Sequence, residues 1–182
     1  MFDGVGRRRN ETAVGSMFNL GSNSLNGNER DCLFRNNGDG TFTDVAYVEN
    51  ADRVEDGRGV AMFDYDQDGR PDIALRNYKQ PAQLLHNLGT AGGRHWLELK
   101  LIGTRSNRDA VGARVTLRSG GLLQTREVHA GSGYQSGSSL IQHFGLGDAT
   151  TIDEIHIRWP SGSESTLTDV TPDQLLVVRE AA

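Results

Sequence analysis

Four aspartates at closely spaced positions are the residues of this chain best placed to do chemistry. They lie in FDYDQDGRPDIAL, residues 63–75, with the spacing Asp64-x-Asp66-x-Asp68-Gly69-x-x-Asp72. Carboxylates at alternate positions of a curling loop can point at one centre, and Gly69 permits the sharp turn that this requires. Because such groups repel one another strongly unless a cation lies among them, the spacing predicts a metal site.

Calcium is the cation expected in this loop. Ca²⁺ accepts about six to eight oxygen ligands in a flexible geometry, whereas Mg²⁺ demands a stricter octahedron. We expect side-chain oxygens from three of the aspartates, the backbone carbonyl oxygen of Arg70, and a fourth carboxylate that closes the shell directly or through water. The predicted metal ligands are Asp64, Asp66, Asp68, Arg70 and Asp72. The alternative is a solvated acidic turn whose aspartates only cap backbone amides.

The elements that must position this loop are strands. Apolar residues on both sides of it predict strands at 59–64 and 72–77, so the loop is not an EF-hand, whose flanks are helices. An L-[FL]-x-N-x-G phrase occurs at 33–38 and again at 84–89, which indicates a repeated supersecondary unit. The first copy continues as DGTFTDVA, which predicts a strand, a glycine turn and a second strand.

The C-terminal half predicts a separate all-β domain. In HWLELKLI, residues 95–102, three leucines face one way while Trp96, Glu98 and Lys100 face the other. ARVTLRSGGLLQTREVHA predicts a hairpin, and further strands follow in SLIQHFGL, EIHIRW, ESTLTDV and QLLVVRE. Strands with such short turns predict a compact antiparallel β-sandwich or jelly-roll-like domain. Trp96, Trp159 and Phe144 are expected to pack in or around its core rather than to hold a ligand.

Composition narrows the function classes. Acidic residues outnumber basic ones by 24 to 19, which gives no general electrostatic case for nucleic acid. The 23 glycines and the 36% of hydrophobic residues favour short strands and tight turns. The single cysteine, Cys32, excludes an internal disulfide. No run approaches the roughly 18 apolar residues of a membrane-spanning helix, and no apolar signal segment follows the arginines at positions 7–9.

No motif predicts catalysis, and we expect no catalytic residue. The glycine-rich AGSGYQSGSS, residues 130–139, is neither the G-x-S-x-G elbow of hydrolases nor a phosphate-binding loop. Two interpretations of it stay open: a recognition loop that presents Tyr134, or an ordinary long hairpin. His129, His143 and His156 lie on predicted strands, but their spacing is not that of a zinc site.

The residues also resemble known families. NNGDGTFTDVA, GRGVAMFDYDQDGRPDIALRN and LLHNLG are similar to an FG-GAP or VCBS-type repeat, the calcium-loop blade of integrin-like β-propellers. HWLELKLIGTRSNRDAVGARVTLRSGG, REVHAGSGYQSGSSLIQHFGLGD and IRWPSG are similar to the ASPIC/UnbV domain. This pairing resembles the cartilage acidic protein family and its bacterial relatives. The resemblance implies a secreted or periplasmic, calcium-associated protein without established enzymatic activity.

Fold class and organisation follow from the residue patterns and the resemblance together. We expect an all-β chain with a polar extended arm at 1–30, a partial propeller-like blade with its calcium loop at 31–92, and the sandwich at 93–182. A propeller closes with about four to eight blades, and only one repeat and part of another are present. The blade therefore has an open strand edge that another part of the chain or another protein must cover.

The function expected on these grounds is that of a non-catalytic calcium-binding interaction module that docks to another protein outside the cell or in the periplasm. The alternative is an accessory structural subunit of a larger, membrane-associated periplasmic complex. A carbohydrate-binding or carbohydrate-active protein has only fold analogy in its favour, because the adjacent Asp153 and Glu154 would point to opposite faces of a strand.

Overall fold

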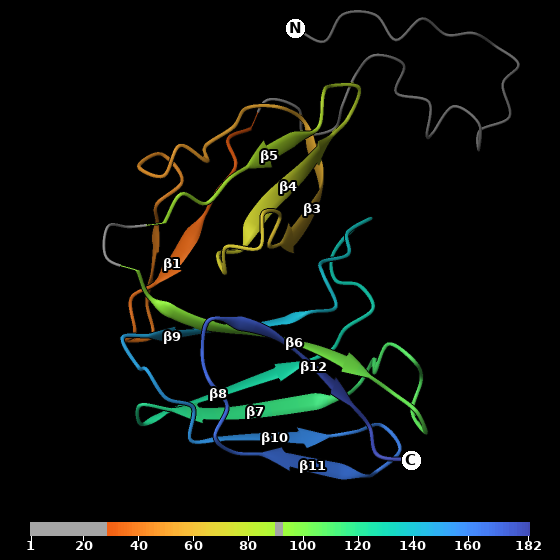
Figure 1. Ribbon diagram of the computed structural model, residues 1–182. Coiled ribbons are helices and arrows are strands. Elements are labelled where there is room, and N and C mark those ends of the chain that lie inside the picture. Colours follow the sequence, from red (N-terminus) through yellow and green to blue (C-terminus); the bar gives the residue numbers. More distant parts are fainter. Residues whose placement is uncertain (1–28, 90–92) are drawn as a thin grey trace, which may run out of the picture. The chain divides into compact units, whose positions relative to one another are not determined.

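The computed structural model describes residues 29–89 and 93–182, and these residues form two compact units (Figure 1). One unit runs up to Asp56 and includes Tyr78–Gln80, while the other joins Gly57–Asn77 to Pro81–Ala182. All regular elements within the described ranges are strands, so the predicted all-β class is confirmed. No helix in this part of the chain is long and apolar enough to cross a membrane. The predicted arm at 1–30 lies almost wholly outside the described residues, and the domain boundaries predicted near 30 and 92 stay predictions.

The first unit contains the hairpin predicted from LFRNNGDGTFTDVA. Its strands, β1 (Phe34–Asn36) and β2 (Phe42–Asp44), pair antiparallel, and Gly38 and Gly40 take positive φ values of 83° and 89° in the turn between them. Positive φ is the conformation that glycine adopts without steric penalty, which explains the two glycines of the turn.

The blade-like sheet of the second unit has three antiparallel strands in the order β3-β4-β5. These are β3 (Gly57–Phe63), β4 (Asp72–Asn77) and β5 (Gln83–Leu85), and the aspartate loop joins the first two. The strand–loop–strand prediction is therefore confirmed. Apolar side chains lie on both faces of the sheet but are only partly covered, as in Met62, which keeps 50% of its surface exposed.

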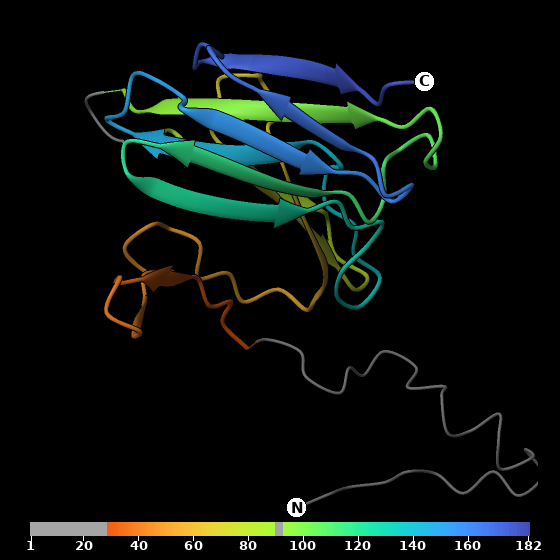
Figure 2. The same cartoon turned by 90° about the horizontal axis from the view of Figure 1, so that it is seen from below.

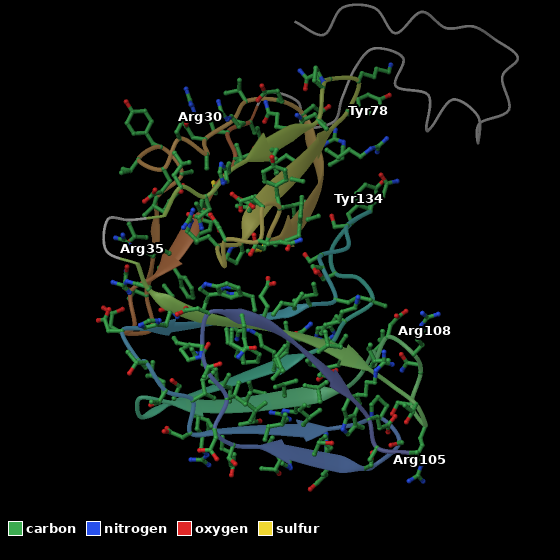
Figure 3. All side chains as sticks on the ribbon, in the orientation of Figure 1. Arg30, Arg35, Tyr78, Arg105, Arg108 and Tyr134 are labelled. Atoms are coloured by element: carbon green, nitrogen blue, oxygen red, sulfur yellow. The ribbon has the colours of Figure 1, made fainter. Side chains whose placement is uncertain are left out.

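The glycine- and serine-rich segment 130–139 covers the outer edge of β3. The hydroxyl oxygens of Ser136 and Ser138 accept hydrogen bonds from the amides of Val60 and Met62, at 3.0 and 3.2 Å, and the Ser139 amide donates to the Met62 carbonyl oxygen at 3.0 Å. Serine hydroxyls thus occupy positions that a fourth strand would take. Tyr134 lies near the middle of this segment and is 69% exposed (Figure 3).

The C-terminal part of the second unit is a two-layer sandwich (Figures 1 and 2). One layer has the strand order β12-β6-β9, and the other has the order β11-β10-β7-β8. The first layer contains β6 (His95–Ile102), β9 (Gln142–Gly147) and β12 (Gln174–Arg179). The second contains β7 (Arg114–Ser119), β8 (Leu122–Glu127), β10 (Glu154–Arg158) and β11 (Glu164–Leu167). The predicted sandwich is confirmed, with one parallel pair, β6 and β12, that the sequence did not indicate.

Successive side chains of each strand point to opposite faces, so every second residue points into the core between the two layers. Leu97, Leu99 and Leu101 point inward from β6 and are 0 to 5% exposed, as predicted. The other core residues come from both layers and their connections: Ala110, Ala113, Val115, Leu117, Val128, Phe144, Leu146, Ile152, Ile155, Ile157, Trp159 and Val178. Burial of this apolar surface, at about 25 cal/mol per Å², is the main favourable contribution to the stability of the domain.

A buried carboxylate ties the two layers together at the end of β12. The Glu180 side chain accepts hydrogen bonds from the amides of Thr104, Arg105 and Ser106 at 2.7–2.9 Å, and from three serine hydroxyls. The three serines are Ser106, Ser161 and Ser163. Burial alone would raise the pKa of Glu180, but the hydrogen bonds outweigh it and hold the pKa well below its ordinary value of 4.5.

Candidate metal centre

The aspartate loop curls because its own side chains bind its backbone amides. Asp64 accepts hydrogen bonds from the amides of Gln67, Asp68 and Gly69 at 2.8, 3.2 and 2.7 Å. This places Gln67 and Gly69 at positive φ values of 62° and 82°. The strain at Gln67 is offset by the hydrogen bonds to the Asp64 carboxylate.

Asp72 holds the loop at its second end. Its side chain is 1% exposed, and its two oxygens accept hydrogen bonds from the amides of Tyr65 and Asn87 at 2.9 and 2.7 Å. Asn87 follows β5, so this carboxylate joins the end of the third strand to the loop between the first two. Asn87 also donates from Nδ2 to the Pro71 carbonyl oxygen at 3.2 Å. Each carboxylate oxygen of Asp72 has a second lone pair, so it can also bind a metal ion or accept another hydrogen bond.

Two groups of side chains in this loop could hold a metal ion. Ligand atoms of Asp64, Asp66 and Asp72 lie within 4.8 Å of one another, and so do ligand atoms of Asp66, Asp68 and His86. The two groups share Asp66. Because the first group offers only carboxylate oxygens, it suits a hard cation such as Ca²⁺, whereas the second adds an imidazole nitrogen, which transition metals prefer.

The structure distributes the four predicted aspartates over these two groups, with Asp66 in both, and it adds a residue that sequence reasoning missed. His86 lies directly after β5, and its Nε2 is 3.1 Å from a carboxylate oxygen of Asp66. Its ring also packs edge-on against Tyr65, with 5.9 Å between ring centroids. The signal available in the sequence was its place inside LLHNLG, beside the asparagine that binds Asp72. No pattern in the sequence predicted that LLHNLG would lie against the aspartate loop.

Arg70 contributes its side chain to the loop. The guanidinium group pairs with Asp68 and donates from Nε to the Asn87 carbonyl oxygen at 2.8 Å. A cation that draws on Asp68 would compete with this ion pair. The metal role predicted for the Arg70 carbonyl oxygen stays a prediction.

The two copies of the L-[FL]-x-N-x-G phrase adopt the same local structure. In the first copy the Gly38 amide donates to the side-chain oxygen of Asn36 at 2.8 Å, and in the second the Gly89 amide donates to that of Asn87 at 3.0 Å. Both glycines have positive φ, and both phrases end a strand, β1 or β5. The internal repeat is therefore present in the local structure as well as in the sequence.

The loop rests on the outer face of the sandwich layer that contains β6 (Figure 1). Gly69 is buried against the indole of Trp96, and Nε2 of His143 donates to the Gly69 carbonyl oxygen at 2.8 Å. Burial lowers the pKa of His143, although the hydrogen bond to Gly69 and the charge of Asp64 act in the opposite direction. Trp96 is thus a rim residue, while Trp159 and Phe144 lie in the core.

The three histidines considered for a zinc site are not brought together. His143 binds Gly69, and His156 has its Nε2 3.3 Å from a carboxylate oxygen of Glu164. His129 belongs to neither metal-binding group found among the described residues. The candidate centre is therefore confined to the aspartate loop and His86.

Two protein-family models match parts of this chain. A family model described as FG-GAP-like repeat matches residues 20–75, and one described as ASPIC and UnbV matches residues 103–182. The chain carries an FG-GAP-like repeat followed by an ASPIC/UnbV domain. The FG-GAP-like match contains all four aspartates of the loop and ends before His86. Neither matched model describes an enzyme family.

Curated relatives of the chain are cartilage acidic proteins. Cartilage acidic protein 1 of Xenopus tropicalis is 39% identical over 84 residues, which is 44% of this chain and 13% of that protein. Cartilage acidic protein 1 of Homo sapiens is 41% identical over 68 residues, which is 37% of this chain and 10% of that protein. The chain thus spans about a tenth of the length of these relatives.

Proposed function

We propose that this chain is a non-catalytic calcium-binding β module of an exported protein, and that it docks to another protein. The observation that carries the calcium part is the group of Asp64, Asp66 and Asp72, whose ligand atoms lie within 4.8 Å of one another in a loop held by amide hydrogen bonds. A bound ion neutralises carboxylates that otherwise repel one another, and it stabilises the loop on the sandwich.

Docking is supported by the surface of the β3–β4–β5 sheet. Val60 and Met62 share one face of β3 and are 48 and 50% exposed, while Leu84 lies on the opposite face of the sheet, on the edge strand β5, and is 45% exposed. Partly exposed apolar residues on a sheet that has an open strand edge, here that of β5, are typical of a surface that another polypeptide covers. The resemblance to cartilage acidic proteins supports an extracellular or periplasmic location.

The calcium part is tested by thermal unfolding of the full chain in excess calcium and in excess chelator. A ligand that binds only the folded state at about 100 times its Kd stabilises that state by about 2.7 kcal/mol. For a chain of this length, this corresponds to a rise of roughly 5–10 °C in Tm. Asp66→Asn should abolish the rise, because both metal-binding groups include Asp66. An equal Tm in calcium and chelator for the unaltered chain contradicts the proposal.

The docking part is tested by isolating the native protein with whatever binds it. Met62→Glu places a charge on the half-exposed sheet surface and should remove a specifically bound protein. Leu123→Glu is the matched control, because Leu123 is a comparably exposed (57%) apolar residue on β8 of the sandwich. Recovery of the same bound protein with Met62→Glu would exclude this surface as the docking site, and a fixed set of several subunits would favour an accessory role in a complex.

A further inference from the structure

The second copy of the repeated phrase, LLHNLG at 84–89, lacks the strand that accompanies the first copy. After LFRNNG at 33–38 the chain turns and forms β2, which pairs antiparallel with β1. After LLHNLG the next strand is β6, which belongs to the sandwich and pairs with β9 and β12. β5 is therefore the last strand on its side of the sheet (Figure 1), and no strand within residues 29–89 and 93–182 pairs with its outer edge.

The first copy shows which main-chain groups of the phrase bind the accompanying strand. The Leu33 carbonyl oxygen accepts a hydrogen bond from the Val45 amide at 2.8 Å, and the Asn37 amide donates to the Thr41 carbonyl oxygen at 3.0 Å. Because successive backbone groups of a strand point to opposite sides, Arg35, midway between Leu33 and Asn37, faces β2 as well. A phrase of this type therefore binds a strand through its first, third and fifth residues.

The corresponding residues of the second copy are Leu84, His86 and Leu88. Between the last two, the Asn87 amide donates to Asp72, the first residue of β4, at 2.7 Å. The amides on either side of Asn87 therefore point away from β4 and toward the open edge. Leu84, His86 and Leu88 are all exposed, and no hydrogen bond from the His86 or Leu88 amide occurs within the described ranges. The groups that bind β2 in the first copy are thus accessible from solvent in the second.

The opposite edge of the same sheet is covered by the chain itself. Ser136 and Ser138, in the segment 130–139, accept hydrogen bonds from the amides of Val60 and Met62 on β3. An uncovered strand edge is a template for pairing with another polypeptide, and proteins commonly cover their edges for this reason. The contrast between β3 and β5 indicates that strand addition to this sheet is confined to the β5 side.

We propose that the edge of β5 takes a strand from a partner protein, and that this strand has the chemistry of β2. In β2 and the residue before it, TFTD at 41–44, threonines alternate with an aromatic residue and an aspartate follows. The partner strand runs antiparallel to 84–88, and its aspartate takes the place of Asp44, whose Oδ1 accepts the Leu33 amide at 3.2 Å. Main-chain hydrogen bonds provide the affinity of such a complex, and alternate side chains provide its specificity. The inference rests on the docking proposed above and names the partner of the same sheet.

The probe for the test is a synthetic peptide with the sequence of residues 39–48, DGTFTDVAYV, which contains β2. Amide hydrogen exchange of the isotopically labelled full chain is followed residue by residue by NMR. Exchange at Leu84, His86 and Leu88 should slow about tenfold when roughly nine tenths of the chain carries peptide, because only the free fraction then exchanges. The Asn87 amide, which is already hydrogen-bonded, should change little.

Three outcomes of this experiment would overturn the inference. The first is unchanged exchange in about 1 mM peptide, a concentration at which even a weak complex is half formed. The second is protection confined to residues 33–37, because the peptide would then only replace β2 on β1. The third is protection at residues 84–88 that grows with the concentration of the chain alone, because the occupant of the edge would then be a second copy of this chain.

A pair of variants at Leu84 tests whether the main chain carries the binding. Leu84→Pro removes a donor from the open edge, a place where an edge strand tolerates proline, and should weaken peptide binding by about tenfold. Leu84→Ala is the matched control, because it shortens the same side chain but keeps the amide, and should change binding by no more than about twofold. Equal affinities of the two variants would contradict strand pairing. If Leu84→Pro does not fold, the exchange measurement on the unaltered chain decides.

Isolation of the native protein separates this inference from the docking on which it rests. A bound protein that is lost with Met62→Glu but retained with Leu84→Pro would refute strand pairing at β5 and leave docking to the sheet intact. If no protein accompanies the unaltered chain, the docking proposal itself fails.

Discussion

Replacement of Gly69 by alanine tests how the aspartate loop is seated on the sandwich. A Cβ atom at this position would lie 2.0 Å from Cε2 and 2.1 Å from Nε1 of Trp96, far inside van der Waals contact. Gly69 also has a φ of +82°, which costs an alanine about 1–2 kcal/mol. Displacement of a packed indole adds about 1–3 kcal/mol, so the expected loss is roughly 2–5 kcal/mol of unfolding free energy.

A matched glycine separates the two contributions. Gly121 has a φ of +80°, but a Cβ there would meet nothing within 4 Å. Gly121→Ala should therefore lose only the backbone part, about 1–2 kcal/mol. The difference between the two variants isolates the contact with Trp96, and it should be about 1–3 kcal/mol.

Urea unfolding followed by tryptophan fluorescence measures this difference, because both tryptophans, Trp96 and Trp159, belong to the sandwich. In a Trp96→Leu background, Gly69→Ala should become nearly as mild as Gly121→Ala, since the smaller side chain leaves room for the methyl group. Equal losses for Gly69→Ala and Gly121→Ala in the unaltered background would refute the packing of the loop against Trp96.

Three further predictions follow from hydrogen bonds in the second unit. Asp72→Asn should lose about 1–3 kcal/mol of stability even in chelator, because one of the two amides bound by Asp72 then faces an NH₂ group; urea unfolding measures the loss. Ser136→Ala combined with Ser138→Ala should expose the β3 edge and speed amide hydrogen exchange at Val60 and Met62, whereas Ser132→Ala, at an exposed serine of the same segment, should not. The folded state lowers the pKa of Glu180, so the ionised carboxylate stabilises the fold above its ordinary pKa of 4.5 and this stabilisation is lost as the pH falls below that value. The Tm difference between the unaltered chain and Glu180→Gln should therefore be constant above about pH 5.5 and shrink below 4.5.

The local patterns of the sequence were sufficient for the strands and their inward faces. Alternation in HWLELKLI placed Leu97, Leu99 and Leu101 in the core, because successive side chains of a strand point to opposite faces whatever the strand packs against. The turn glycines could be predicted for a similar reason, since positive φ at Gly38 or Gly69 is a property of the local backbone. The position of the four aspartates between two apolar runs likewise predicted a loop between two strands, while their role as metal ligands stays a prediction.

What the tertiary structure decided is which distant segments cover these local elements. The alternation of β6 placed Trp96 on its outer face but could not predict that Gly69 of the aspartate loop would pack against it, because that contact joins residues far apart in the chain. The same holds for His86 beside Asp66, for the serines along β3, and for the parallel pairing of β12 with β6. A period of two residues determines the faces of a strand, while the partner of each face depends on long-range packing. The sequence by itself therefore determined the acidic loop, and only the fold decided which histidine and which tryptophan lie beside it.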